Sequence, residues 1–353
     1  MTNRLIALGK RLQKESLKAL LVSKPANIYY LSGFTSPDAL LLITPFARFI
    51  ITDARYKEEA QELKGFELRL IDKTYHDSIV QIVRETGIKN VGFESEDLTY
   101  GRVARLSRSL KKGGVSMRAT VGLTEDLRAL KEPAEIRSIK AAVGAAQKAF
   151  AALRIVPGMT EKEVARRLDE RMIAAGAQGS AFTTIVASGK NASRPHAITT
   201  DRRISRNEPV VIDFGARAGM YNCDLTRVKV LGKIQGTLRD IFSIVREAQQ
   251  RAIAGVRPGM RARDIDKIAR DFIASRGYGG SFGHALGHGV GIEVHEAPRI
   301  SATSPDTLQP GMVITIEPGI YLERIGGVRL EDMLRITETG YEVLTDDIPQ
   351  RDQ

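Results

Sequence analysis

Three of the chain's five histidines lie in one glycine-rich segment, GHALGHGVGIEVHEAP, at residues 283–298. His284 and His288 are four residues apart, a spacing that on a helix would place two imidazoles on one face as a zinc pair. Glycines at 283, 287, 289 and 291 disfavour a helix, and no HExxH sequence is present. The pattern favours a loop or strand that supplies one histidine to a site, with glycines that let the backbone pass close to that site.

Four acidic residues interrupt apolar, strand-like sequences elsewhere in the chain. Asp213 closes the run VVID and Glu317 closes VITIE, while Asp224 follows the first acid by 11 residues and Glu331 follows the second by 14. An acid inside an apolar strand is costly unless it is paired or bound to a cation. One such acid alone would be read as a structural ion pair, but four in matched positions predict a divalent metal centre. Four carboxylates and one imidazole favour Mn²⁺ over a thiolate-type zinc site, with Co²⁺ or Zn²⁺ as alternatives.

The acids belong to a duplicated unit. Residues 156–179 align with residues 257–280 at a constant offset of 101, and each copy shows a turn, an amphipathic helix and a glycine stop. In the first copy Thr160 and Glu163 fit a capping box. Each helix is followed by two strand-like runs joined by a turn that contains glycine. We therefore expect two pseudo-symmetric halves whose acids face one another.

Alternation along a strand adds neighbours to these acids. Thr226 shares a strand face with Asp224, and Arg329 shares one with Glu331. A hydroxyl at position 226 could hydrogen-bond a metal-binding carboxylate. Cys223, the single cysteine, would point to the opposite face from Asp224 and behave as a small buried hydrophobe.

The residues before this duplication show a different order of predicted elements. Residues 1–125 alternate helical and strand signals, which predicts an α/β domain. Helices are expected at 3–17, 55–63 and 76–86, and strands at 19–23, 39–44, 47–52, 66–71 and 90–95. Pro133, at the first turn of a longer helix, marks the start of a second domain that we place at 126–353.

Composition limits the remaining function classes. The 353 residues are 42% apolar and 27% charged, as in an ordinary globular protein. The net charge of +11 raises nucleic acid as a partner, but the basic residues are interleaved with acids and only 6% of residues are aromatic, so we do not expect one. One cysteine excludes an internal disulfide framework, and no apolar run is long enough to span a bilayer. We expect a cytoplasmic protein without membrane contact.

Five motifs together resemble one family. IDFGA, NCDLTR, GHALGHGVGIEVHE, ITIEPGIY and GGVRLED occur in the order and spacing of the pita-bread metallopeptidases of family M24, which include Xaa-Pro dipeptidases (prolidases), aminopeptidase P and methionine aminopeptidases. The resemblance extends through SGKNASRPHAITTDRRI, SKPANIYYLSGF and ITDARY to nearly the whole chain. It implies an N-terminal creatinase-like α/β domain followed by a pseudo-two-fold pita-bread catalytic domain, a mixed α/β (α+β) fold.

The resemblance also implies roles for individual residues. Two divalent cations would be bound by Asp213, Asp224, His288, Glu317 and Glu331, with Asp224 and Glu331 bridging the two. Catalytic roles would fall to His196, His284, His295, Glu317 and Arg329, which match positions that line the site. His295 would help to stabilise the oxyanion and Glu317 would carry a proton.

The activity implied is hydrolysis of Xaa-Pro bonds by an Xaa-Pro dipeptidase, on a peptide with proline at its second position. Aminopeptidase P activity on longer peptides is the closest alternative, and the compact members of the family are commonly homodimers. A non-catalytic binding protein on the same scaffold is a remote alternative, because every ligand of the family is present.

Overall fold

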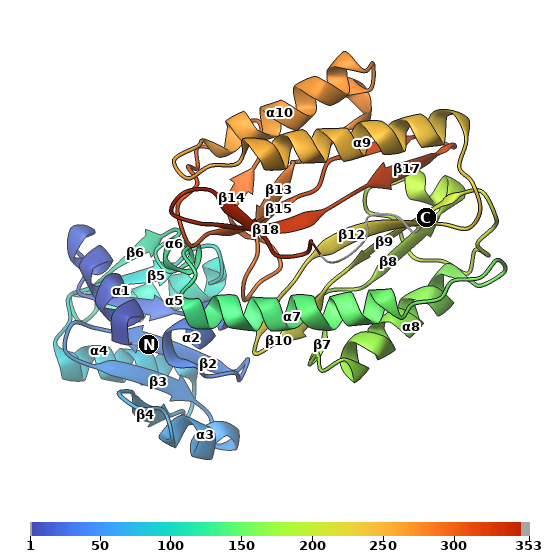
Figure 1. Ribbon diagram of the computed structural model, residues 1–353. Helices are drawn as coiled ribbons and strands as arrows, with labels where there is room; N and C mark the ends of the chain where they lie inside the picture. Colours follow the sequence, from blue (N-terminus) through green and yellow to red (C-terminus); the bar gives the residue numbers. More distant parts are fainter. Residues whose placement is uncertain (1, 347–353) are drawn as a thin grey trace. The chain divides into compact units, whose positions relative to one another are not determined.

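The computed structural model describes residues 2–346, and the chain forms two compact units, Met1–Arg128 and Ala129–Gln353 (Figure 1). The sequence placed the division three residues earlier. The short helix α6 (Glu125–Arg128) ends the first unit, and α7 (Pro133–Ala151) is the first helix of the second. Pro133 occupies the first turn of α7, as predicted.

A six-stranded mixed sheet in the order β4-β3-β2-β1-β5-β6 forms the centre of the first unit. β1 is buried along its whole length, as expected of a strand that is covered on both faces. Its antiparallel neighbour is β2 and its parallel neighbour is β5. The strands are β1 (Ala19–Val22), β2 (Ala39–Ile43), β3 (Arg48–Thr52), β4 (Glu67–Leu70), β5 (Asn90–Glu94) and β6 (Ser116–Thr120).

The helices of the first unit bury apolar stripes against this sheet. Ile79 and Val83 of α4, with Leu106 and Leu110 of α5, pack in one cluster with Leu21 of β1. The five predicted strands and three predicted helices are present, whereas α2, α5, α6 and β6 were not predicted. The helices are α1 (Thr2–Lys14), α2 (Pro25–Ser32), η1 (Ala54–Tyr56), α3 (Lys57–Gln61), α4 (Tyr75–Thr86), α5 (Tyr100–Lys111) and α6.

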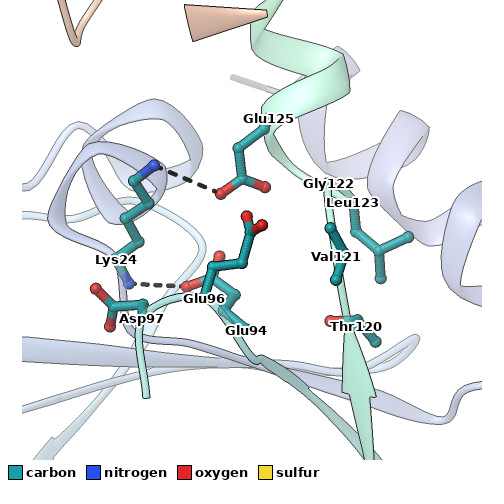
Figure 2. Close-up of a pocket in the computed structure, with 9 residues that line it drawn as sticks. All are labelled: Lys24, Glu94, Glu96, Asp97, Thr120, Val121, Gly122, Leu123 and Glu125. Atoms are coloured by element: carbon teal, nitrogen blue, oxygen red, sulfur yellow. Dashed lines mark hydrogen bonds and ion pairs between the residues drawn. The ribbon is translucent and has the colours of Figure 1, made fainter. Parts of the chain in front are cut away.

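Glu94, the last residue of β5, is a buried acid in a small pocket of the first unit (Figure 2). Its carboxylate accepts hydrogen bonds from the backbone N–H groups of Ser23 and Lys24, at 2.7 and 2.8 Å, and from the Asn27 amide at 2.7 Å. Burial raises the pKa of Glu94 to about 7, although these hydrogen bonds oppose the rise. The acid therefore anchors the start of α2.

The second unit consists of two halves with the same order of elements, as the repeat predicted. α8 (Glu161–Ala174) and α10 (Ala262–Ser275) are both 14 residues long and begin 101 residues apart. Thr160 and Glu163 form the predicted capping box, with both of its hydrogen bonds present. Gly176 and Gly277 follow the two helices with φ of 100° and 86°, the left-handed conformation that ends a helix most easily at glycine.

The strands of the second unit lie between the helices of the two halves. Figure 1 shows α7 and α8 on one side of these strands, and α9 (Gly236–Gly255) with α10 on the other. The other strands are β7 (Gly179–Ser180), β8 (Ile185–Ser188), β13 (Gly287–Gly289), β14 (Glu296–Ile300) and β19 (Tyr341–Val343), with short helices η2 (Gly189–Ser193) and η3 (Gly279–Ser281). No helix between residues 2 and 346 is long and apolar enough to cross a membrane.

Each half contains the predicted hairpin, but its strands are not continuous. In the first half an outer pair, β9 (Pro209–Phe214) with β12 (Leu225–Val230), leads into an inner pair, β10 (Ala216–Ala218) with β11 (Tyr221–Asn222). In the second half the pairs are β15 (Val313–Ile316) with β18 (Asp332–Ile336) and β16 (Gly319–Leu322) with β17 (Gly326–Arg329).

The breaks between outer and inner pairs have local causes. A Cβ on Gly215 would lie 2.0 Å from the carbonyl oxygen of Cys223, so only glycine fits at the first break. Pro318 follows β15 in the second half and has no N–H to continue the ladder. The expectation of two continuous strands per half was therefore wrong, and the breaks fall where the acids lie.

Candidate metal centre

The four acids predicted as metal ligands lie at the breaks of the two hairpins. Asp213 is the penultimate residue of β9, and Asp224 directly precedes β12. Glu317 directly follows β15, and Glu331 lies between β17 and β18. Because a break turns a side chain away from the regular ladder, equivalent breaks in two facing halves can bring these carboxylates together.

His288 completes this cluster from the middle of β13, a strand and not a helix, as predicted. A Cβ on Gly287 would lie 2.0 Å from the Thr315 carbonyl oxygen, and one on Gly289 would lie 2.2 Å from that of Ala297. These two glycines therefore let β13 lie against neighbouring backbone. Close passage of the backbone by the site was the expected reason for these glycines, and for Gly287 and Gly289 the structure gives this different one.

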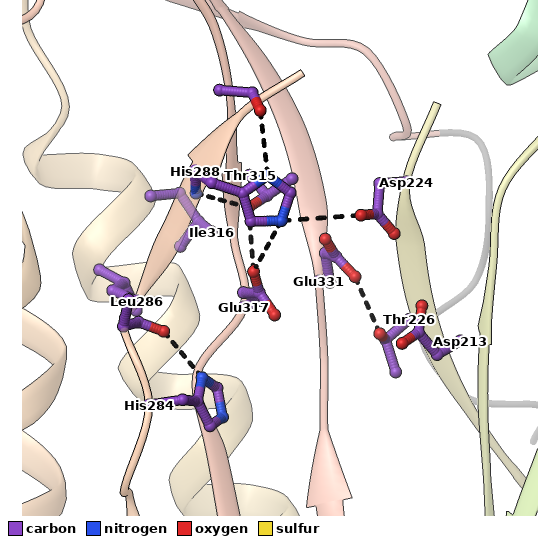
Figure 3. Close-up of polar contacts among 12 residues, drawn as sticks. Asp213, Asp224, Thr226, His284, Leu286, His288, Thr315, Ile316, Glu317 and Glu331 are labelled. Atoms are coloured by element: carbon purple, nitrogen blue, oxygen red, sulfur yellow. Dashed lines mark hydrogen bonds and ion pairs between the residues drawn. The ribbon is translucent and has the colours of Figure 1, made fainter. Parts of the chain in front are cut away.

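The side chains of the cluster converge from both halves (Figure 3). His288 Nε2 lies 3.2 Å from Glu317 Oε1 and 3.7 Å from Asp224 Oδ2. Asp224, His288 and Glu331 each offer one ligand atom, and these three atoms lie within 4.8 Å of one another. His288 Nδ1 donates a hydrogen bond to the Gly289 carbonyl at 3.0 Å, and this bond orients the ring so that Nε2 faces the carboxylates.

Burial and mutual repulsion dominate the electrostatics of the acids. Burial, and then the charge of Asp213, raises the pKa of Asp224 well above its ordinary value. The pKa of Glu331 is also raised well above its ordinary value, by burial and the charge of Asp224. Burial opposes the ionisation of Glu317 too, but the hydrogen bond and charge of His288 outweigh it and lower the pKa of Glu317. A bound cation would relieve this repulsion and stabilise the ionised carboxylates.

The donor set fits divalent cations. Asp213 Oδ1 and Glu331 Oε1 are buried and accept no hydrogen bond from any residue that the structure describes. Unpartnered carboxylate oxygens are costly in a protein interior unless a cation satisfies them. Oxygen ligands with a single imidazole suit Mn²⁺ and similar ions, and no cysteine faces the cluster, because Cys223 is buried with its sulfur accepting the Ala216 N–H.

This geometry agrees with the comparison with known families. Residues 137–338 match the metallopeptidase family M24, more than half of the chain. The chain belongs to metallopeptidase family M24. Residues 4–130 match the creatinase/prolidase N-terminal domain, so the first unit corresponds to that domain. The protein is therefore a peptidase with the fold that the motifs implied.

Relatives of this M24 peptidase cover almost its whole length. It is 39% identical over 350 residues to an Xaa-Pro dipeptidase of Pyrococcus furiosus, with 98% of each chain covered. Among solved structures it resembles an Xaa-Pro dipeptidase from Bacillus anthracis, with a TM-score of 0.94, 36% identity and coverage of 98% and 97%. It also resembles an X-Pro aminopeptidase from Thermotoga maritima, with a TM-score of 0.87, 37% identity and coverage of 95% and 97%.

Arg329 is the buried cation of the M24 site. Its guanidinium donates to Asp213 Oδ2 at 2.6 Å, to Thr226 Oγ1 at 3.0 Å, to the Tyr321 hydroxyl at 2.9 Å and to the Pro195 carbonyl at 3.0 Å. Burial opposes the charge, but the neighbouring Tyr321 and Asp213 raise the pKa of Arg329 well above its ordinary value. Arg329 therefore remains charged and connects a predicted ligand to the loop that carries His196.

The other predicted histidines lie around the cluster in different settings. His284 Nδ1 donates to the Ala285 carbonyl at 2.7 Å, and its Nε2 lies 3.2 Å from the Tyr321 hydroxyl. The rings of His295 and His288 are 4.3 Å apart. Burial lowers the pKa of both His284 and His295, so both rings are neutral near pH 7. His196 is exposed, and its proximity contributes to lowering the pKa of both His284 and His295.

Three groups of this site escaped the sequence analysis. Thr315 donates from Oγ1 to Glu317 at 3.2 Å and accepts from the His288 N–H at 3.1 Å; its position two residues before Glu317 on one strand was the available signal. The Tyr321 hydroxyl bridges Arg329 and His284. Glu161 was not considered.

Glu161 holds the loop that carries His196. Fully buried at the first position of α8, its carboxylate accepts five hydrogen bonds of 2.7 to 3.0 Å. The donors are the backbone and hydroxyl of Ser188, the Asn191 amide, and the backbone and hydroxyl of Thr200. Both ends of the segment 188–200 are thus fixed to one carboxylate, because its charge satisfies donors that would otherwise be buried unpaired.

Proposed function

We propose that this M24 peptidase hydrolyses Xaa-Pro bonds as an Xaa-Pro dipeptidase that uses two divalent cations, with Mn²⁺ as the expected ion. The observation that carries the metal-dependent part is the convergence of Asp224, His288 and Glu331, with Asp213 and Glu317 beside them, at the breaks of two facing hairpins. The substrate class is supported by full-length similarity to Xaa-Pro dipeptidases. Proline lacks an amide N–H, so peptidases that require this donor fail on such bonds.

In this proposal the cations are held by Asp213, Asp224, His288, Glu317 and Glu331. When bound, they supply positive charge that polarises the scissile carbonyl and lowers the pKa of water. Glu317, which directly follows β15 at the edge of the cluster, would accept and return the proton. His295, neutral because of burial and its neighbour His288, can donate a hydrogen bond to a developing oxyanion.

The remaining catalytic residues orient the substrate and the ligands. Arg329 keeps Asp213 in place through its 2.6 Å ion pair. His284 receives its orientation from the Ala285 carbonyl and the Tyr321 hydroxyl. His196, exposed on a loop that Glu161 fixes, is free to contact a bound peptide.

Aminopeptidase P activity on longer peptides is the second candidate, because the chain is 37% identical to an X-Pro aminopeptidase of known structure and 36% identical to a dipeptidase of known structure. The two are separated by assaying metal-stripped protein, with and without Mn²⁺, on an Xaa-Pro dipeptide and an Xaa-Pro-Xaa tripeptide. We expect Mn²⁺-dependent cleavage of the dipeptide. Cleavage of the tripeptide alone would establish the aminopeptidase, and hydrolysis of neither would refute both.

The assembly and compartment are part of the same proposal. We propose a homodimer in the cytoplasm that binds no nucleic acid, with a first domain at residues 1–125 and a catalytic domain at 126–353. A buried free cysteine, Cys223, is consistent with a reducing compartment. Sedimentation analysis of the purified chain tests the dimer.

A further inference from the structure

Arg227 is a fully buried arginine in the middle of β12. It alternates with Thr226 along the strand, so its side chain points to the face opposite the metal centre. Its guanidinium donates to the Thr226 carbonyl at 3.1 Å, to the Glu331 carbonyl and to the Thr345 carbonyl at 3.0 Å. It also forms a 2.6 Å ion pair with Asp332. One side chain of the first half thus holds the backbone of Glu331 in the second half.

Asp332 extends this contact to a third element. It directly follows Glu331 and accepts hydrogen bonds from the Thr345 hydroxyl at 2.7 Å and from the Gln249 amide at 3.1 Å. Gln249, fully buried on α9, also donates to the carbonyl of Ile316 at 3.2 Å. Ile316 directly precedes Glu317, so the network reaches the backbone beside a second carboxylate of the cluster.

Stability alone does not explain such a network. The free energy lost when a charged pair is removed from water is about as large as the free energy of attraction between the two charges. Apolar residues of the same size therefore often stabilise a fold equally well. A planar guanidinium with several fixed donors is, however, well suited to hold carbonyl groups at set positions. Arg227 donates to the carbonyl groups of Thr226 and Glu331, and Gln249 donates to that of Ile316, so the network holds backbone on strands from both halves. Asp332 links the two donors through its carboxylate.

We propose that Arg227, Asp332 and Gln249 are positioning residues that set the spacing of the carboxylates across the two halves and thereby the affinity for the second cation. This inference rests on the proposed function only in that two cations bind at the cluster. It requires no particular peptide substrate. Its test is therefore a metal-binding measurement on the full-length chain.

The first variant is Arg227→Lys, which keeps the charge opposite Asp332 but loses the fork that contacts three carbonyl groups. The second is the double variant Arg227→Met with Asp332→Leu, which replaces the ion pair by apolar side chains and so protects folding. The control is Lys229→Met, two residues further along the same face of β12. Lys229 is also buried, but it donates to the Leu153 carbonyl and lies over the Phe150 ring, away from the cluster.

Metal-stripped proteins are titrated with Mn²⁺ by calorimetry, and the loaded forms are compared by electron paramagnetic resonance, in which coupling between two Mn²⁺ ions reports their spacing. We expect both Arg227 variants to bind the second Mn²⁺ about 10- to 100-fold more weakly and to show altered coupling, the size of effect known for outer-shell partners of metal ligands. The Lys229 variant should bind as the parent chain does.

Two results distinguish this inference from the proposed function. Parent-like isotherms and coupling in both Arg227 variants would overturn the inference and leave the Xaa-Pro activity intact. Weakened second-site binding in a chain that cleaves no Xaa-Pro peptide would support the inference and refute the proposed substrate.

Discussion

The Thr226 hydroxyl donates to Glu331 Oε2 at 2.8 Å, from a residue 105 positions away in the other half of the duplicated unit. The hydroxyl oxygen of Thr226 also accepts a hydrogen bond from Arg329 Nε at 3.0 Å. Thr226 thereby orients Glu331, a predicted bridging ligand, and connects it to the buried guanidinium of Arg329. Arg227, the next residue on the strand, holds the backbone carbonyl of Glu331 from the opposite face.

Thr226→Val should weaken metal binding while the chain stays folded. Valine matches threonine in shape but leaves Glu331 without a donor and Arg329 Nε without an acceptor. We expect Mn²⁺ affinity to fall about tenfold or more, measured by calorimetry on metal-stripped protein. Thr226→Ser, which keeps the hydroxyl, should retain the parent affinity. Equal affinities in the valine and serine variants would exclude this role.

Asp224→Asn should abolish the dinuclear site. The amide loses the charge that a bridging ligand supplies, so Mn²⁺ affinity should fall by more than about 100-fold, beyond the range of outer-shell changes. Because burial and Asp213 already oppose ionisation of Asp224, the metal-free variant should be at least as stable to heat as the metal-free parent. Asp240→Asn, an exposed acid on α9, is the control. Retained activity and metal content would refute the ligand assignment.

Glu161→Gln should impair substrate binding more than metal binding. A glutamine has one acceptor oxygen in place of two, and its amide hydrogens would face the donors of Asn191 and Thr200. The segment 188–200 should loosen, raising KM about tenfold with a smaller change in kcat, because His196 loses its position. Steady-state kinetics and hydrogen exchange of this segment test the prediction. Glu170→Gln, exposed on the same helix, should change neither.

Glu94 should make the local stability of the first unit depend on pH. Its folded pKa of about 7 lies above the ordinary value of 4.5, so the folded state retains a proton that the unfolded chain releases. This contribution is complete below pH 4.5 and is lost as the pH rises through about 7, a change of about 3 kcal/mol. Intrinsic-rate-corrected hydrogen exchange of residues 19–32 should show protection falling over this interval.

The charged residues around Glu94 are Lys24, Glu96, Asp97 and Glu125, and they supply the control for this measurement. Glu94→Gln should remove most of the pH dependence, because the amide does not titrate in this interval. Glu96→Gln, exposed at the same pocket, should preserve it. A parent chain whose protection is constant between pH 4.5 and 7.5 would contradict the raised pKa.

The sequence by itself determined the repeated architecture and the family. Glycine, proline and capping residues act locally, so α8 and α10 could be predicted at the same offset, with the capping box of Thr160 and Glu163 and the stops at Gly176 and Gly277. Acids in apolar strands are locally anomalous, and so Asp213, Asp224, Glu317 and Glu331 could be found as a set without knowledge of their contacts.

Only the tertiary structure decided how these residues meet. The strand breaks that orient the acids depend on contacts such as that of Gly215 with Cys223. The network of Arg227, Asp332 and Gln249 is also long-range, since Arg227 bonds Thr345, 118 positions away. Arginine, aspartate and glutamine carry no local signal that they are buried, because their partners come from other elements. Long-range hydrogen bonds in a low-dielectric interior form only when both halves pack together. The residue pattern along a single strand therefore does not predict them.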